Sequence, residues 1–162
     1  MDKGFVRVFC GKAGEKTALA LGQAINLASQ GDSVIIIQFL NEKDERKIKF
    51  IQQLEPEVKL FRFEKSEVSF EELSTEKKLE EQQNIKNGLN FAKKVLTTRE
   101  CGLLVLDGIL DLLEYKIICN NDLKGIIEQR SDDVGIILTG VNFQAEGFPY
   151  IDDLIKLESV KM

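Results

Sequence analysis

The segment that decides the fold lies near the start of the chain and reads Phe5-Val6-Arg7-Val8-Phe9-Cys10-Gly11-Lys12-Ala13-Gly14-Glu15-Lys16-Thr17. Its first six residues, 5–10, are mostly β-branched or aromatic, which predicts a strand that ends before Gly11. From Lys16 to Gly31 the apolar residues recur at helical spacing. A continuous apolar run follows at 34–40. Together these features predict a strand, a glycine-containing loop, a helix and a second strand, which form one βαβ unit.

Two further apolar runs lie at residues 103–107 and 134–140. They lack the alternation of a half-exposed strand, and such runs are typical of a parallel sheet that is covered on both faces. The other expected elements are helices at 42–54, 76–96 and 123–129, a strand at 58–63, and a helix or strand at 151–160. The inward side of the helix at 76–96 is expected to hold Leu79, Gln83, Leu89, Ala92, Val95 and Leu96. This order predicts a single α/β domain over residues 1–162, with a mostly parallel sheet and helices on both faces.

The composition argues against several classes of function. The chain has 162 residues, with 22 Lys and Arg against 27 Asp and Glu, so its net charge is −5. This acidic balance disfavours a nucleic-acid partner, which requires clustered basic residues. The sequence contains no histidine, which excludes Ser-His-Asp and Cys-His nucleophile pairs and the HExxH zinc site. No window approaches the roughly 20 apolar residues of a membrane span, so we expect no membrane partner.

The cysteines indicate the cellular compartment. Cys10, Cys101 and Cys119 form no CxxC pair and lie far apart in the sequence. Such a set is typical of a reducing compartment rather than of a disulfide framework. We therefore expect a cytoplasmic protein with buried free thiols.

Residues 11–17 connect the first predicted strand to the first helix. Glycine lets the backbone N–H groups converge on an anion, and the helix N-terminus adds partial positive charge. Lys16 would bring a full charge to a phosphate, and the hydroxyl of Thr17 would be a ligand for Mg²⁺. The spacing departs from GxxxxGK[ST], because Gly11 precedes Lys16 by five residues instead of six and Glu15 replaces the second glycine. A strand–turn–helix with incidental glycine and lysine is therefore the alternative.

Asp107 follows four apolar residues at the end of the predicted strand 103–107. Ligands of parallel α/β sheets bind beyond the carboxyl ends of the strands, where the loop at 11–17 is also expected. A carboxylate in this place would lie beside Mg²⁺ at that loop. Alone, the aspartate fits equally well as a cap of the next segment. Together with the loop, it predicts a nucleotide site of the P-loop NTPase type in a RecA- or Rossmann-like fold.

Several segments, taken in order, resemble the ATP:corrinoid adenosyltransferase family, the P-loop type of cob(I)alamin adenosyltransferase. The family's shortened loop, TG(D/N)GKGKTT, has the spacing of residues 10–18. Its VxIVQFLKG, (V/I)LDE, (I/L)TGR and VTEMxxVK signatures are similar to residues 34–42, 105–108, 138–141 and 156–161. Where the family has an aromatic loop over the corrinoid, this sequence offers Phe70. The similarity spans nearly the whole chain.

The resemblance implies transfer of the 5′-deoxyadenosyl group of ATP to the reduced cobalt of a corrinoid such as cobalamin. Lys16 would neutralise phosphate, and Thr17 and Asp107 would hold Mg²⁺. The residues expected to bind the nucleotide are Gly11, Lys12, Ala13, Gly14, Glu15, Lys16, Thr17 and Ala18. No side chain is assigned as a catalytic acid, base or nucleophile. The implied partners are the small molecules ATP and corrinoid, and the resemblance allows a homodimer.

The chain departs from the family signatures at several positions. Ala13 adds a methyl group to the loop, and Glu15 adds a negative charge beside the phosphates. Gly108 replaces the family's second carboxylate, and Val141 replaces its arginine. We expect Asp111 to lie on another face and not to substitute for the missing carboxylate. These changes predict weak Mg·ATP binding and slow transfer. The alternatives are a non-catalytic relative that binds nucleotide or corrinoid, and a small P-loop ATPase or kinase.

Overall fold

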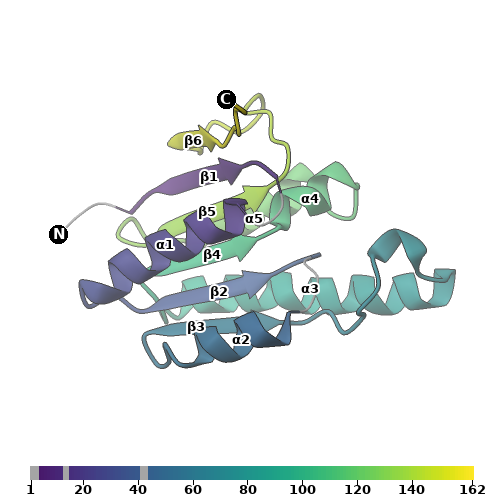
Figure 1. Cartoon of the computed structure of the whole chain (residues 1–162), viewed down its shortest axis with the longest axis horizontal. Helices are drawn as coiled ribbons and strands as arrows, with labels where there is room; N and C mark the ends of the chain where they lie inside the picture. The colour runs from purple at the N-terminus through teal and green to yellow at the C-terminus, as the bar shows by residue number, and fades with distance from the viewer. Residues whose placement is uncertain (1–3, 13–14, 41–43) are drawn as a thin grey trace.

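The computed structural model describes residues 4–12, 15–40 and 44–162. Within these residues, six strands form one parallel sheet in the order β3-β2-β4-β5-β1-β6 (Figure 1). The strands are β1 (Val6–Cys10), β2 (Val34–Gln38), β3 (Val58–Arg62), β4 (Leu103–Asp107), β5 (Gly135–Gly140) and β6 (Asp153–Lys156). The helices are α1 (Glu15–Ser29), α2 (Glu45–Gln52), α3 (Thr75–Thr97), α4 (Ile109–Glu114) and α5 (Asn120–Ile127), with a 3₁₀ turn, η1 (Phe70–Glu72), before α3. This arrangement confirms the predicted parallel α/β fold.

Helices cover both faces of the sheet, as the apolar strands require. On one face, α1 and α2 contribute Ala20, Ala24 and Ile51 to a core with the inward side chains of the strands. On the other face, α3 and α5 contribute Ala92 and Leu123, among others, to a second core (Figure 1). β4 is buried along its whole length between β2 and β5. Both sides of the central strands are therefore dry, which is why their sequences lack polar alternation.

The strand register brings the carboxyl ends of four strands together. Cys10 at the end of β1 pairs with Gly140 at the end of β5. Gln38 at the end of β2 pairs with Asp107 at the end of β4. A single residue, Gly108, separates β4 from α4, and its φ of +87° is a left-handed conformation that glycine adopts without strain. The loop after β1 and the carboxylate of Asp107 therefore lie at the same edge of the sheet, as the sequence predicts.

The inward side of α3 differs from the prediction in its N-terminal half. Leu79 and Gln83 are exposed there, whereas Glu81 is only 5% exposed. The Glu81 carboxylate accepts hydrogen bonds from the backbone N–H groups of Lys65 and Ser66, at 3.0 and 3.3 Å. This half of the helix extends past the strands and lies beside the segment that contains η1 (Figure 1). Its partner is a polar loop instead of an apolar sheet, so a carboxylate faces inward.

Two elements go beyond the sequence prediction. α4 has six residues, and its apolar side chains Ile109, Leu110 and Leu112 are all buried, so no amphipathic pattern marks it as a helix. β6 resolves the open assignment of 151–160, because Asp153–Lys156 pairs in parallel with β1 as an edge strand. The short helix α4 has the greater consequence, since it carries a residue of the site.

The thiols and the helices bear on the remaining expectations. Cys10 and Cys101 are buried as expected, whereas Cys119 is exposed at the start of α5, where its thiol contacts the Asp122 carboxylate. In the part of the chain that the structure describes, no helix combines the length and apolar character needed to cross a membrane.

Candidate functional site

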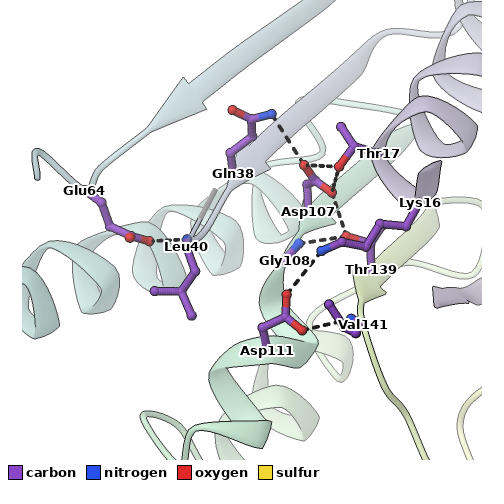
Figure 2. A network of polar contacts seen from close by, with 10 residues as sticks. All are labelled: Lys16, Thr17, Gln38, Leu40, Glu64, Asp107, Gly108, Asp111, Thr139 and Val141. Carbon is purple, nitrogen blue, oxygen red and sulfur yellow. Dashed lines mark hydrogen bonds and ion pairs between the residues drawn. The ribbon is translucent and has the colours of Figure 1, made fainter. Parts of the chain in front are cut away.

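The candidate site lies at the carboxyl edge of β1, β4 and β5. Lys16 and Thr17 belong to the first turn of α1, and Asp107 ends β4 (Figure 2). The structure brings these three residues together, although residues 17 and 107 are 90 positions apart in the sequence. Lys16 and Asp107 are each only 1% exposed. Buried charged groups are rare unless they are paired, so this arrangement indicates a built polar site within the core.

Asp107 is held in place by hydroxyl groups from two other elements. Thr139 Oγ1 in β5 donates to Asp107 Oδ1 at 2.6 Å, and Thr17 Oγ1 lies 3.0 and 3.1 Å from the two carboxylate oxygens. Thr139 Oγ1 in turn accepts a hydrogen bond from the backbone N–H of Gly108 at 2.7 Å. A longer contact of 3.4 Å joins Gln38 Nε2 to Asp107 Oδ2. The carboxylate is thus preorganised by β2, β5 and α1 (Figure 2).

Lys16 forms an ion pair that the sequence does not predict. Its Nζ lies 3.1 Å from Asp111 Oδ2, and the Asp111 side chain is 15% exposed. Asp111 Oδ1 accepts a hydrogen bond from the backbone N–H of Val141 at 2.9 Å. The expectation that Asp111 lies on another face is therefore wrong. α4 begins directly after Gly108, and its first turn carries position 111 back toward α1 (Figure 2).

The other loop residues are less well defined. Ala13 and Gly14 lie outside the described residues, as does the side chain of Glu15, so the expected effect of Glu15 on phosphate stays a prediction. Lys12 and Ala18 are exposed. The N–H of Gly11 donates to the carbonyl oxygen of Gly140 at 3.2 Å, which continues the β1–β5 pairing into the loop, and a Cβ on Gly11 would come within 2.9 Å of the Leu157 side chain.

The donor set fits a magnesium ion that arrives with a nucleotide. The hydroxyl of Thr17 and the carboxylate of Asp107 are hard oxygen ligands, the kind that Mg²⁺ prefers. Within the described residues, no cluster of three or more His, Cys, Asp or Glu side chains could hold a metal. A protein that offers only one or two oxygens leaves the remaining positions to water and phosphate, which is typical of Mg²⁺·nucleotide sites.

A groove of about 950 Å³ lies next to the loop. Its lining includes Gly11 and, from α4 and the chain after β5, Leu110, Val141, Phe143 and Phe148. The rings of Phe143 and Phe148 pack with their centroids 5.0 Å apart. Phe70, the aromatic residue that the sequence offers for covering a corrinoid, instead lines a separate cavity of about 250 Å³ with Leu40, Glu64 and Tyr115.

Glu64 links the segments that follow β2 and β3. Its Oε1 accepts a hydrogen bond from the backbone N–H of Leu40 at 2.9 Å (Figure 2). Burial raises the pKa of Glu64 to about 6, and the neighbouring Glu81 carboxylate adds to the rise, while the Leu40 N–H and Arg62 oppose it. A glutamate with a raised pKa in the folded state holds its proton more tightly there than in the unfolded chain.

Stability should therefore fall as the pH rises from about 4.5 to about 6, and then level off. Glu64→Gln removes this titration while keeping an oxygen that accepts from Leu40. We expect the variant to gain up to about 2 kcal/mol in unfolding free energy, relative to wild type, between pH 4.5 and pH 7. Urea denaturation at both pH values measures this double difference. Glu67→Gln, an exposed neighbour in the same loop, is the matched control. An unchanged difference for Glu64→Gln would contradict the assigned environment.

The fold and site together define a class of protein. A parallel sheet, a loop before α1 with lysine and threonine in the first helical turn, and a carboxylate at the end of β4 are the features of P-loop nucleotide-binding proteins. The sequence profile of the family described as ATP:corrinoid adenosyltransferase BtuR/CobO/CobP matches residues 2–162. The chain belongs to this family of transferases.

A solved structure supports the fold independently. The KaiC-like protein PH0186 from the hyperthermophilic archaeon Pyrococcus horikoshii OT3 superposes with a TM-score of 0.62 at 18% sequence identity. The match covers 100% of this chain and 76% of that one. At this identity the similarity establishes the fold alone. No curated protein matches the chain.

Sequence reasoning identifies Lys16, Thr17 and Asp107, and it misses Asp111, Thr139 and Gln38 as members of the site. Thr139 and Gln38 do lie within the segments that resemble the family signatures, at the ends of apolar strands. A polar residue at the end of a buried parallel strand is the signal that could have found them.

Proposed function

We propose that the chain binds Mg·ATP at the loop before α1 and transfers its 5′-deoxyadenosyl group to reduced corrinoid cobalt, slowly. The observation that carries this proposal is the contact between Thr17 and Asp107, supported by Thr139. It joins the hydroxyl of the phosphate loop to the strand-end carboxylate in the way that a Mg²⁺·nucleotide site requires. Cytoplasmic location and assembly as a homodimer stay predictions.

The proposed chemistry makes few demands on side-chain acids or bases. The cobalt of the substrate supplies an electron pair to the 5′ carbon of ATP, a cobalt–carbon bond forms, and the bond from that carbon to the triphosphate oxygen breaks. The electron pair of the broken bond leaves with triphosphate. The protein's part is to align the two substrates and to stabilise the charge on the leaving group. A chain without histidine can perform both tasks.

Each residue of the site has a distinct part in this proposal. Lys16 would place its positive charge against the phosphates, and the loop amides from Gly11 onward would donate to their oxygens. Thr17 and Asp107 would hold Mg²⁺, which supplies further charge neutralisation when bound. The groove beside Gly11, with its aromatic wall at Phe143, is the place we assign to the second substrate.

The slow rate follows from the departures around Gly108 and Val141. Position 108 supplies no second carboxylate, and its φ of +87° would strain any residue with a side chain by roughly 1–2 kcal/mol. Gly108→Glu is therefore not a simple restoring change in this backbone. Val141 contributes only its backbone N–H to the site, to Asp111. The leaving triphosphate thus lacks contacts of a kind that typically contribute about 10²–10³ in rate.

Two measurements test the proposal. Calorimetric titration with Mg·ATP should show binding, and the absorbance of chemically reduced cobalamin mixed with Mg·ATP should report slow formation of the cobalt–carbon bond. Binding without bond formation would favour the non-catalytic relative instead. Absence of Mg·ATP binding would contradict the proposed site. A rate equal to that of a family member with complete LDE and TGR signatures would contradict the expected weakening.

A further inference from the structure

The Lys16–Asp111 ion pair is a built feature of the site. It joins the first turn of α1 to the first turn of α4, across a distance of 3.1 Å, with the lysine almost completely buried. The second oxygen of Asp111 is held by the N–H of Val141. Gly140 makes room for this arrangement, because a Cβ there would lie 2.5 Å from Leu110 Cβ and 3.2 Å from Asp111 Oδ1. Three separate elements therefore hold the carboxylate against the lysine.

This position is the one that a phosphate would claim. Lys16 directly precedes Thr17, whose hydroxyl contacts Asp107, so both side chains face the same edge of the sheet (Figure 2). A carboxylate and a phosphate have the same charge sign and the same preference for an ammonium group. In a site with little solvent the two anions repel each other strongly. Phosphate binding must therefore either displace Asp111 from Lys16 or tolerate its charge.

We propose that Asp111 is an internal competitor of nucleotide phosphate for Lys16, so that this carboxylate sets the affinity of the loop for polyphosphates. The inference rests on the proposed function, in which Lys16 binds phosphate. It adds that the weak affinity expected of this chain comes from a residue in α4, in addition to the changes within the loop. In the nucleotide-free protein, Asp111 also keeps the buried ammonium group paired.

Asp111→Asn removes the competing charge with little change of shape. The asparagine oxygen can still accept from Val141, whereas the amide no longer neutralises Lys16. We expect inorganic triphosphate and Mg·ATP to bind about ten- to a hundredfold more tightly than to wild type, which corresponds to one charge-assisted hydrogen bond regained by the phosphate. The nucleotide-free variant should melt at a lower temperature, because Lys16 is left buried without its carboxylate, and triphosphate should raise its melting temperature more than that of wild type.

Asp122→Asn is the matched control. Asp122 occupies the first turn of α5, and its carboxylate likewise accepts a backbone hydrogen bond, from Cys119 at 2.9 Å, so the variant loses the same charge away from Lys16. Its affinity for triphosphate should stay at the wild-type level. Asp111→Ser, which is also neutral and can accept from Val141, should reproduce the gain if Asp111→Asn folds poorly.

The outcomes separate this inference from the proposed function. Tighter triphosphate binding by the Asp111 variants, with or without measurable binding to wild type, supports the competitor role. Wild-type binding that is unchanged or weakened in both Asp111 variants overturns it and leaves the proposed function standing. Failure of wild type and of both variants to bind either triphosphate or Mg·ATP overturns both. An equal gain in Asp122→Asn would assign the effect to net charge and overturn the specific role of Asp111.

Discussion

Adenosyl transfer by a Lys16→Met variant should be about 10²–10³-fold slower than by wild type. Lys16 carries the positive charge nearest to the expected position of the phosphates, and no neutral side chain can replace that charge when triphosphate leaves. Methionine preserves most of the volume of the lysine stem, which matters because residue 16 is only 1% exposed. The measurement is the rate of cobalt–carbon bond formation at saturating Mg·ATP.

Two further variants make the result interpretable. Lys16→Met leaves the Asp111 carboxylate without its cation, so the double variant with Asp111→Asn shows whether a loss of activity comes from misfolding. Lys124→Met removes an exposed lysine from α5 and should keep the wild-type rate. A Lys16→Met rate within tenfold of wild type, in a folded protein, would show that Lys16 does not stabilise the leaving group.

Asp107→Asn should cause a loss of similar size, about 10²–10³-fold, with a different signature. The carboxylate accepts hydrogen bonds from Thr17 and Thr139 and is one of two oxygen groups that fit Mg²⁺ at this edge. An amide has about the same shape but is uncharged, and its NH₂ group cannot accept a hydrogen bond. We expect the Mg²⁺ concentration for half-maximal activity to rise sharply, while binding of metal-free triphosphate changes much less.

Titration of Mg²⁺ at a fixed ATP concentration measures this split. Asp133→Asn is a suitable control, because it removes an exposed carboxylate from the turn before β5 and should keep the wild-type dependence on Mg²⁺. If Asp107→Asn lowers the rate without changing the Mg²⁺ dependence, Asp107 positions Thr17 instead of holding the metal. An unchanged rate would remove Asp107 from the site.

The sequence alone was sufficient for the architecture. The runs at 34–40, 103–107 and 134–140 are continuous and apolar, and only a strand covered on both faces accommodates such a run, so the parallel sheet between two helix layers followed directly. The site residues Lys16, Thr17 and Asp107 could be identified because each immediately follows a strand or begins a helix. Carboxyl ends of parallel strands must meet at one edge, whatever the rest of the chain does.

The partners of these residues were decided by the tertiary structure. Lys16 and Asp111 are 95 positions apart, and their contact depends on α4 starting one residue after β4, which in turn depends on the left-handed backbone of Gly108. No local pattern marks α4, because its apolar residues are buried instead of forming one stripe. The inward side of α3 was mispredicted around Glu81 for a related reason. Helical periodicity shows that a helix has an inner side, but the chemistry of that side is set by the segment that packs there, and for Glu81 this segment is a loop with free backbone N–H groups instead of a strand.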